Sequence, residues 1–328
     1  MGTSVREPFT SLTFVAVLVS ALAAASCVPA PAASPFRRTV VRFTTGPLGG
    51  GFYPLGEGLA RAYAVSLPNV TIERLPSGGA VANADAIQQG TADLGFAFSD
   101  VAYIAFGGGL GRGSRPYDRL RGIAVLQLTP LHFVVRAGSD IRGITDLRGR
   151  RVGVGLPGTG TALTIELLLT AFGLRQGDVQ VENLSFDEAA RRLVDGSLDA
   201  MFDAAIYPAE SVDMATQAGA RLLPLVGPSV ERLRREYPFF RAAAIPRATY
   251  PGVPAAVRTI GVDSLLICSR DLDESLVHDL TKGFFDALPS LSSSVDALRF
   301  MDLEQSPATP IPLHPGAARF YRERELQR

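Results

Sequence analysis

Three short runs of glycine and small polar residues each follow an apolar, strand-like segment and open a helical pattern. The runs are Gly49-Gly50-Gly51, Ser77-Gly78-Gly79 and Gly158-Thr159-Gly160-Thr161. Strand, small-residue turn and helix in repeated order is typical of βαβ units around a parallel sheet. In such a sheet these turns lie at the carboxyl edge of the strands, where ligands bind. We therefore expect an α/β fold with a ligand site at the three turns.

The strand–turn–helix order occurs twice, once within residues 40–98 and again from 151 to 202. A length of 328 residues is also consistent with two domains. A terminal helix packing back on the first lobe would require two chain crossings, near 127–131 and 261–268. These features predict two lobes with a cleft between them and a two-strand hinge.

The predicted lobe limits follow from the two crossings. The first lobe comprises residues 35–128 and 267–328, and the second comprises residues 129–266. Residues 237–254 are rich in Pro, Tyr and Arg, and we interpret them as an ordered crossover loop. Apolar runs at 123–126 and 132–135 predict two separate strands.

Residues 1–34 are predicted to be a signal peptide and an N-terminal tether. An uncharged, mostly apolar run from Leu12 to Ala25 precedes small residues and Cys27. The run is short for a membrane span, which needs about 20 apolar residues, and is typical of a secretory signal. Cys27 is either lipidated, which would tether the protein to the membrane, or discarded by cleavage nearby. The mature protein is expected in the periplasm in both cases.

Charge and motifs exclude several classes of function. The chain has 32 basic and 32 acidic side chains, whereas a nucleic-acid partner would require a basic face. No phosphate-binding Gly-x-x-x-x-Gly-Lys-Ser/Thr loop and no Gly-x-Ser-x-Gly elbow occurs. The three histidines have no metal-type spacing. We therefore expect no catalytic residue, metal or cofactor.

The starts of the predicted helices are the remaining candidates for a binding site. The first N–H groups of a helix lack intrahelical partners and carry the positive dipole end, so they bind carboxylates and other anions. Hydroxyl groups lie near the predicted turns at Thr45, Ser77, Ser99, Thr159 and Thr161, and Tyr53 and Tyr207 could add a wall. An enzyme remains an alternative. It would need Asp100 as acid or base, whereas the structural role of Asp100 is to cap the helix at Val101.

Several longer segments carry a resemblance to a known family. They are FTTGPLGGGFYPLGEGLA, SGGAVANADAIQQGTADLGFAFSDVAY, LRGIAVLQLTPLHFVVRAGSDIRGITDLRGRRVGVGLPGTGT, YPFFRAAAIPRATYPG and PLHPGAARFYRE. In this order, from about residue 40 to 325, they resemble the TAXI family of solute receptors of tripartite ATP-independent periplasmic (TRAP) transporters. Phe52-Tyr53, where that family often has two Tyr, and Asp203-Ala204-Ala205, where a Gly is frequent, depart from the pattern.

The resemblance implies a periplasmic receptor of the two-lobed periplasmic-binding-protein-like fold (type II), with no catalysis. The implied ligand is a small organic acid or an amino acid, such as glutamate or 2-oxoglutarate, and the implied partner is a membrane permease of a TRAP transporter. A sensory role with a signalling partner is the alternative. The implied ligand contacts are Thr45, Gly46, Gly51, Tyr53, Ser77, Gly78, Gly79, Asn83, Ser99, Gly158, Thr159, Gly160, Thr161 and Tyr207.

Overall fold

A computed structural model describes residues 39–48, 50–110, 115–175, 177–294, 298–299 and 301–326. The predicted signal peptide, Cys27 and Gly49 lie outside these residues. The chain divides into Met1–Arg37 and Arg38–Arg328, and the description below concerns the second unit alone. No helix of the described residues combines the length and the apolar character that a membrane crossing requires.

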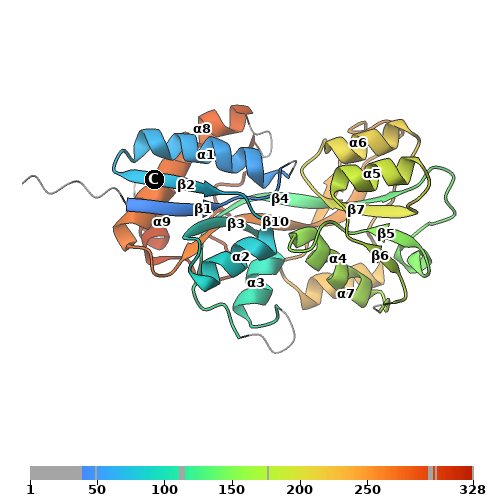
Figure 1. Cartoon of the computed structure of the whole chain (residues 1–328), viewed down its shortest axis with the longest axis horizontal. Helices are drawn as coiled ribbons and strands as arrows, with labels where there is room; N and C mark the ends of the chain where they lie inside the picture. The colour runs from blue at the N-terminus through green and yellow to red at the C-terminus, as the bar shows by residue number, and fades with distance from the viewer. Residues whose placement is uncertain are drawn as a thin grey trace, which may run out of the picture. The chain divides into compact units, whose positions relative to one another are not determined.

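The described strands form one mixed sheet in the order β2-β1-β3-β10-β4-β7-β5-β6 (Figure 1). The strands β1, β2 and β3 are parallel to one another, as are β5, β6 and β7. Between these two groups lie β4 and β10, which run antiparallel to each other. The strand bounds are β1 Thr39–Thr44, β2 Val70–Leu75, β3 Leu94–Phe98, β4 Leu120–Val135, β5 Arg151–Gly153, β6 Gln180–Glu182, β7 Ala200–Ala204, β8 Arg221–Leu222, β9 Arg241–Ile245 and β10 Val257–Ser269.

Strand β4 connects the two groups of strands. Its residues 120–130 pair with β10, and its residues 131–135 pair with β7. The prediction of two strands, at 123–126 and 132–135, is therefore wrong. Thr129 and Pro130 interrupt the apolar run, but Pro130 lies where β4 changes its partner, so the strand continues through it.

Helices cover both faces of each lobe (Figure 1). In the first lobe α1, α8 and α9 share one apolar core, and α2 and α3 pack on the opposite face. In the second lobe α5 and α6 share a core, and α4 and α7 lie on the other face. The helix bounds are α1 Phe52–Ser66, α2 Ala80–Gln89, α3 Ser99–Phe106, α4 Gly160–Ala171, α5 Phe186–Val194, α6 Glu210–Gln217, α7 Pro228–Glu236, α8 Glu274–Ser294 and α9 Pro315–Leu326.

The main predicted features of the architecture are present. The α/β order is confirmed, and α9 packs on α8 in the first lobe, as the terminal helix was expected to do. Residues 237–254 are not a loop throughout, because β9 pairs with β10 within them. Its three consecutive alanines show no strand-like alternation in the sequence. The residue limits of the two lobes stay predictions.

Candidate functional site

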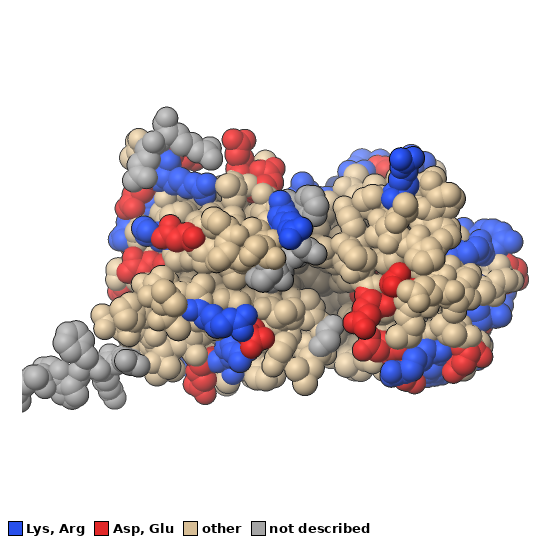
Figure 2. Space-filling model, turned by 90° about the horizontal axis from the view of Figure 1, so that it is seen from above, with Lys and Arg blue, Asp and Glu red and all other residues tan. Residues whose placement is uncertain are grey.

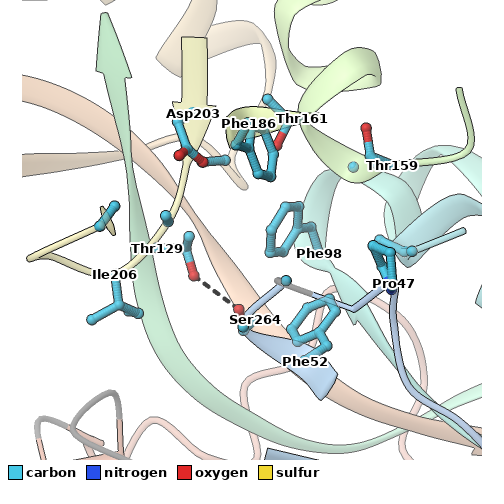
Figure 3. A pocket seen from close by; sticks show the side chains of 18 of the residues that line it. Pro47, Phe52, Phe98, Thr129, Thr159, Thr161, Phe186, Asp203, Ile206 and Ser264 are labelled. Atoms are coloured by element: carbon cyan, nitrogen blue, oxygen red, sulfur yellow. Dashed lines mark hydrogen bonds between the residues drawn. The ribbon is translucent and has the colours of Figure 1, made fainter. Parts of the chain in front are cut away.

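A cavity of about 380 Å³ lies where residues of both lobes meet (Figures 2 and 3). Its volume is in the range of small-molecule sites. Residues at the starts of α1, α2, α4, α5 and α6 contribute to its wall, together with the carboxyl ends of β3 and β7, nearby loop residues and the crossing strands β4 and β10. The residues that line the cavity include Gly51, Phe52, Gly79, Phe98, Gln127, Thr129, Thr159, Gly160, Thr161, Phe186, Asp187, Asp203, Ala205, Ile206, Glu210, Ser211 and Ser264.

The start of α4 presents backbone donors to the cavity. Thr159 is the N-cap, and its Oγ1 accepts the N–H of Ala162 at 3.3 Å. The first N–H groups of a helix have no intrahelical acceptor. Those of Gly160 and Thr161 are therefore left for an occupant, and both residues line the cavity. This start of a helix can bind a small anion.

The start of α2 has a different role. The N–H groups of Val81 and Ala82 both donate to the carbonyl oxygen of Gly158, at 3.1 and 3.3 Å. Gly158 belongs to the turn before α4, so these bonds join the two lobes instead of holding a ligand. Gly79 precedes α2 at a φ of 120°, a left-handed conformation that favours glycine. A Cβ atom there would lie 3.3 Å from Thr159 Cα.

Three aromatic rings line the cavity: Phe52, Phe98 and Phe186. The rings of Phe52 and Phe98 lie 5.3 Å apart, and Phe52 also stacks on Phe96 at 5.1 Å. Figure 3 shows Phe98 between Phe52 and Phe186. Packed rings of this kind bind the apolar part of an organic molecule.

Polar groups of the crossing strands form another part of the wall. Thr129 on β4 and Ser264 on β10 are buried, and their hydroxyl oxygens lie 2.8 Å apart in a hydrogen bond (Figure 3). Gln127 on β4 is also buried, and its Oε1 has no hydrogen-bond partner among the described residues. The wall at the crossing therefore offers an acceptor for a donor on the ligand.

Asp203 is the last residue but one of β7, and it lines the cavity with 1% of its surface exposed. Its Oδ2 accepts a hydrogen bond from Ser211 Oγ at 2.6 Å, whereas its Oδ1 has no partner among the described residues. Burial raises the pKa of Asp203 to about 6; the Ser211 bond opposes this shift and the charge of Asp187 adds to it. Asp203 is therefore ionised at neutral pH despite an unfavourable environment.

A buried relay holds the backbone beside Asp203. The carbonyl oxygen of Asp203 can only accept, so His132 Nδ1, 3.1 Å away, carries the proton. His132 Nε2 then accepts from the Tyr250 hydroxyl at 2.9 Å, and that hydroxyl accepts the N–H of Ala209 at 2.8 Å. Burial lowers the pKa of His132 to about 4, so the ring is neutral. The relay braces the segment from Asp203 to Ala209 that lines the cavity.

The cavity is acidic. Asp187, Asp203 and Glu210 line it, and no Lys, Arg or His occurs among its described lining residues. Figure 2 shows acidic side chains beside the hollow between the lobes. Asp187 and Glu210 lie in the first turns of α5 and α6, where a negative charge stabilises the helix. Asp203 lies in a strand, and no such benefit accounts for it.

Five of the residues that the sequence predicted for the site lie at the cavity: Gly51, Gly79, Thr159, Gly160 and Thr161. The other nine do not line it. They are Thr45, Gly46, Tyr53, Ser77, Gly78, Asn83, Ser99, Gly158 and Tyr207.

Hydrogen bonds explain several of these positions. The Asn83 amide donates to the carbonyl oxygens of Thr45 and Phe96, and its Oδ1 accepts from Ser77 Oγ at 2.5 Å. Ser99 Oγ accepts the N–H of Asp263 at 3.0 Å. These side chains stabilise the framework around the site.

Asp100, the residue an enzyme would need, faces away from the cavity lining. Its Oδ1 accepts the N–H of Val101 at 2.7 Å, as expected, but the N-cap of α3 is Phe98, so Asp100 lies in the first turn of the helix and does not cap it. Its Oδ2 accepts from Thr164 Oγ1 on α4 at 2.5 Å. Burial raises its pKa to about 6. The described residues contain no group of three or more His, Cys, Asp or Glu side chains placed to hold a metal ion.

Sequence reasoning missed the aromatic residues and Asp203. The rule that ligands bind at the carboxyl ends of parallel strands would have identified Asp203, since it lies at the carboxyl end of β7. No local signal marks Phe98 or Phe186 as cavity residues, because phenylalanines are equally common in cores.

A family model described as the NMT1-like family matches residues 43–324. The chain belongs to the NMT1-like family. The match corrects the expectation of a TAXI receptor of a TRAP transporter, which is wrong.

Solved structures share the fold. A Bordetella bronchiseptica RB50 protein is 14% identical over 88% of this chain and 99% of its own, with a TM-score of 0.57. A Xanthomonas citri protein bound to ATP is 13% identical over 87% and 95%, with a TM-score of 0.54. The alkanesulfonate-binding protein SsuA from Xanthomonas axonopodis pv. citri, bound to MOPS, is 17% identical over 87% and 83%, with a TM-score of 0.49. The predicted two-lobed periplasmic-binding-protein-like fold is confirmed.

Proposed function

We propose that this member of the NMT1-like family is an exported receptor that encloses a small organic solute and delivers it to a membrane transporter. The cavity carries the proposal, because both lobes contribute to it and its volume of about 380 Å³ suits a small molecule. The apolar rings would bind the body of the solute. The N–H groups of Gly160 and Thr161 would bind a carboxylate or another small anionic group.

Closure of the lobes would complete the site. Gly79 and Ala80 of the first lobe and Thr159 and Gly160 of the second lobe line the same cavity, so one solute would contact both. Ligands of this kind shift an existing equilibrium between open and closed forms towards the closed form. The bonds from Val81 and Ala82 to Gly158 would form as the lobes meet.

Binding without catalysis fits the groups at the cavity. Asp100, the candidate acid or base, bonds to Val101 and Thr164 and does not line the cavity. Export by residues 1–34, with or without lipidation at Cys27, would place the receptor in the periplasm beside its transporter.

A thermal-shift screen tests the proposal directly. The panel contains amino acids, mono- and dicarboxylates, sulfonates, amines and sugars. A true ligand stabilises the native protein by about 2.7 kcal/mol at a hundredfold excess over its Kd. The absence of a thermal shift with every compound of the panel would argue against a receptor.

A paired substitution locates the binding. Ala205 lines the cavity and is half-buried, so Ala205→Leu should fill space and abolish the shift produced by any panel hit. Ala64 is exposed on α1, and Ala64→Leu should leave the shift unchanged. Equal responses of the two variants would place the ligand elsewhere.

A further inference from the structure

We infer that the solute carries a protonated nitrogen, which Asp203 binds in the cavity wall. This inference rests on the proposed receptor function and specifies its ligand as an amino acid or another amine. It excludes a plain dicarboxylate. Figure 3 shows Asp203 and Thr159 on different sides of the cavity, with Phe98 and Phe186 between them.

The first observation is an incomplete set of hydrogen bonds. Asp203 is 1% exposed, yet only Ser211 donates to its carboxylate and Oδ1 has no partner among the described residues. A buried acceptor without a donor is costly. Gln127 Oε1, on β4 at the strand crossing, is also unpaired. An occupant with an N–H donor at Asp203 would complete the hydrogen bonds of that carboxylate.

The second observation is the charge around Asp203. Asp187 approaches from α5, and Glu210 lies beside Ser211 at the start of α6. His132 approaches from β4, but it is neutral and its Nδ1 contacts the backbone carbonyl. Tyr250 bonds to His132 and Ala209. None of these groups compensates the charge of Asp203, so a cationic occupant would be favoured and a second carboxylate disfavoured.

The remaining walls fit a molecule with a cation at one end. Gly160 and Thr161 offer backbone donors to a carboxylate, and the three phenylalanines offer apolar contact. A protonated amine also binds favourably over an aromatic face. An amine that also carries a carboxylate offers a donor to Asp203 and an acceptor to the N–H groups of Gly160 and Thr161, whereas its deaminated counterpart leaves Asp203 without a donor.

Matched pairs of compounds test the inference by calorimetric titration. The pairs are L-glutamate with glutarate, L-phenylalanine with 3-phenylpropionate, and L-leucine with 4-methylpentanoate. In any pair that binds, the amine-bearing member should bind at least tenfold more tightly. Equal or tighter binding of the deaminated member would overturn the inference and leave the receptor function intact. Failure of these pairs and of the whole screening panel to bind would overturn both.

The variant Asp203→Asn tests whether the charge of Asp203 binds the amine. The substitution keeps the shape and an acceptor for Ser211 but removes the charge, so the amine-bearing compound should bind at least tenfold more weakly. Asp199→Asn is the matched control, since Asp199 directly precedes β7 and bonds to Arg151 outside the cavity lining. Equal losses in the two variants would contradict the inference.

The wild-type protein gives a second readout that requires no folded variant. Binding of an amine requires ionised Asp203, so its affinity should fall about tenfold for each pH unit below the pKa of about 6. The other titratable groups near Asp203 are Asp187, Glu210, His132 and Tyr250. An affinity for the amine that stays constant from pH 7.5 to pH 5 would refute the role of Asp203.

Discussion

Two carboxylates of this chain have the same burial and different surroundings. Asp100 and Asp203 are both at most 1% exposed, and burial raises the pKa of each to about 6. Asp100 accepts bonds at both oxygens from Val101 and Thr164, and lies away from the cavity. Asp203 has one oxygen unpaired and lines the cavity. Unpaired buried charges are typical of functional sites, because a residue that destabilises the folded protein is kept when it is needed for binding.

The pH dependence of unfolding should report this cost. The pKa of Asp203 is about 6 in the native protein and about 3.9 when unfolded, so the native state binds more protons between these values. The contribution of Asp203 to stability therefore falls as the pH rises from about 4 to 6. Without ligand, Asp203→Asn should be equal to wild type near pH 4 and more stable by about 3 kcal/mol at pH 7. Urea unfolding at several pH values measures the difference.

Asp199→Asn should behave in the opposite way. Its bonds with Arg151 lower the pKa of Asp199, so the ionised form stabilises the native protein. The variant should be less stable than wild type at pH 7, and this loss should disappear as the pH falls below about 4. A pH-independent difference for either variant would show that the assigned shift is wrong.

At the scale of elements, the starts of helices do not all serve the same purpose. The start of α4 faces the cavity with free N–H groups, whereas the first N–H groups of α2 bond to Gly158. The start of α4 also lies very close to the end of β3. A Cβ atom on Gly160 would lie 2.2 Å from Phe98 Cδ2, so only glycine allows this approach of α4 to the end of β3.

Gly160→Ala tests this contact. In an isolated helix the change would be stabilising by up to about 1 kcal/mol, because alanine has the higher helix propensity. Here we expect the reverse, a loss of about 1–3 kcal/mol in the closed form, from overpacking against Phe98. Ligand titration should show at least a fivefold weaker affinity. Gly143→Ala is the control, since a Cβ atom there meets nothing within 4 Å. A stabilised Gly160→Ala protein with unchanged affinity would refute the contact.

At the scale of the molecule, two strands and a few backbone and side-chain hydrogen bonds join the lobes. β4 passes from one group of strands to the other, paired with β10 as far as Pro130. Beyond the strands, Asp100 on α3 accepts the hydroxyl of Thr164 on α4. This bond should be present only when the lobes are closed, so it should contribute to ligand affinity without contact with the ligand.

Thr164→Val removes that hydroxyl and keeps the shape of the side chain. Asp100 would lose a donor in a buried position, at a cost of about 1–3 kcal/mol, and the affinity for a panel ligand should fall several-fold. Thr170→Val on the same helix is the control. Its hydroxyl donates to the carbonyl oxygen of Glu166, four residues earlier. The Thr164 hydroxyl has the equivalent contact with Gly160 and, in addition, the bond to Asp100 that the test addresses. Equal affinities of the two variants, measured by titration, would show that the Asp100–Thr164 bond has no role in closure.

Local patterns in the sequence predicted most of the fold. The ends of α2 follow from local sequence, because Gly79 before it and Gly90 after it adopt the positive φ that favours glycine. β9 was missed, because its three consecutive alanines show no alternation of apolar and polar residues. The predicted ligand contacts stay predictions, and the structure shows only which of them lie at the cavity. Thr159 and Gly160 line the cavity, whereas Asn83 and Ser99, which looked equally suitable, bond within the framework.

The sequence by itself determined the α/β order, the starts of the helices and the neutral net charge, because each depends on local composition and spacing. The tertiary structure decided which starts face the cavity and where charge remains uncompensated. Asp203 is one of 32 acidic residues in the sequence. It becomes distinctive only because folding removes it from water, places Asp187 near it and leaves one oxygen without a donor. Burial and distance set such energies, and both depend on residues far apart in the chain.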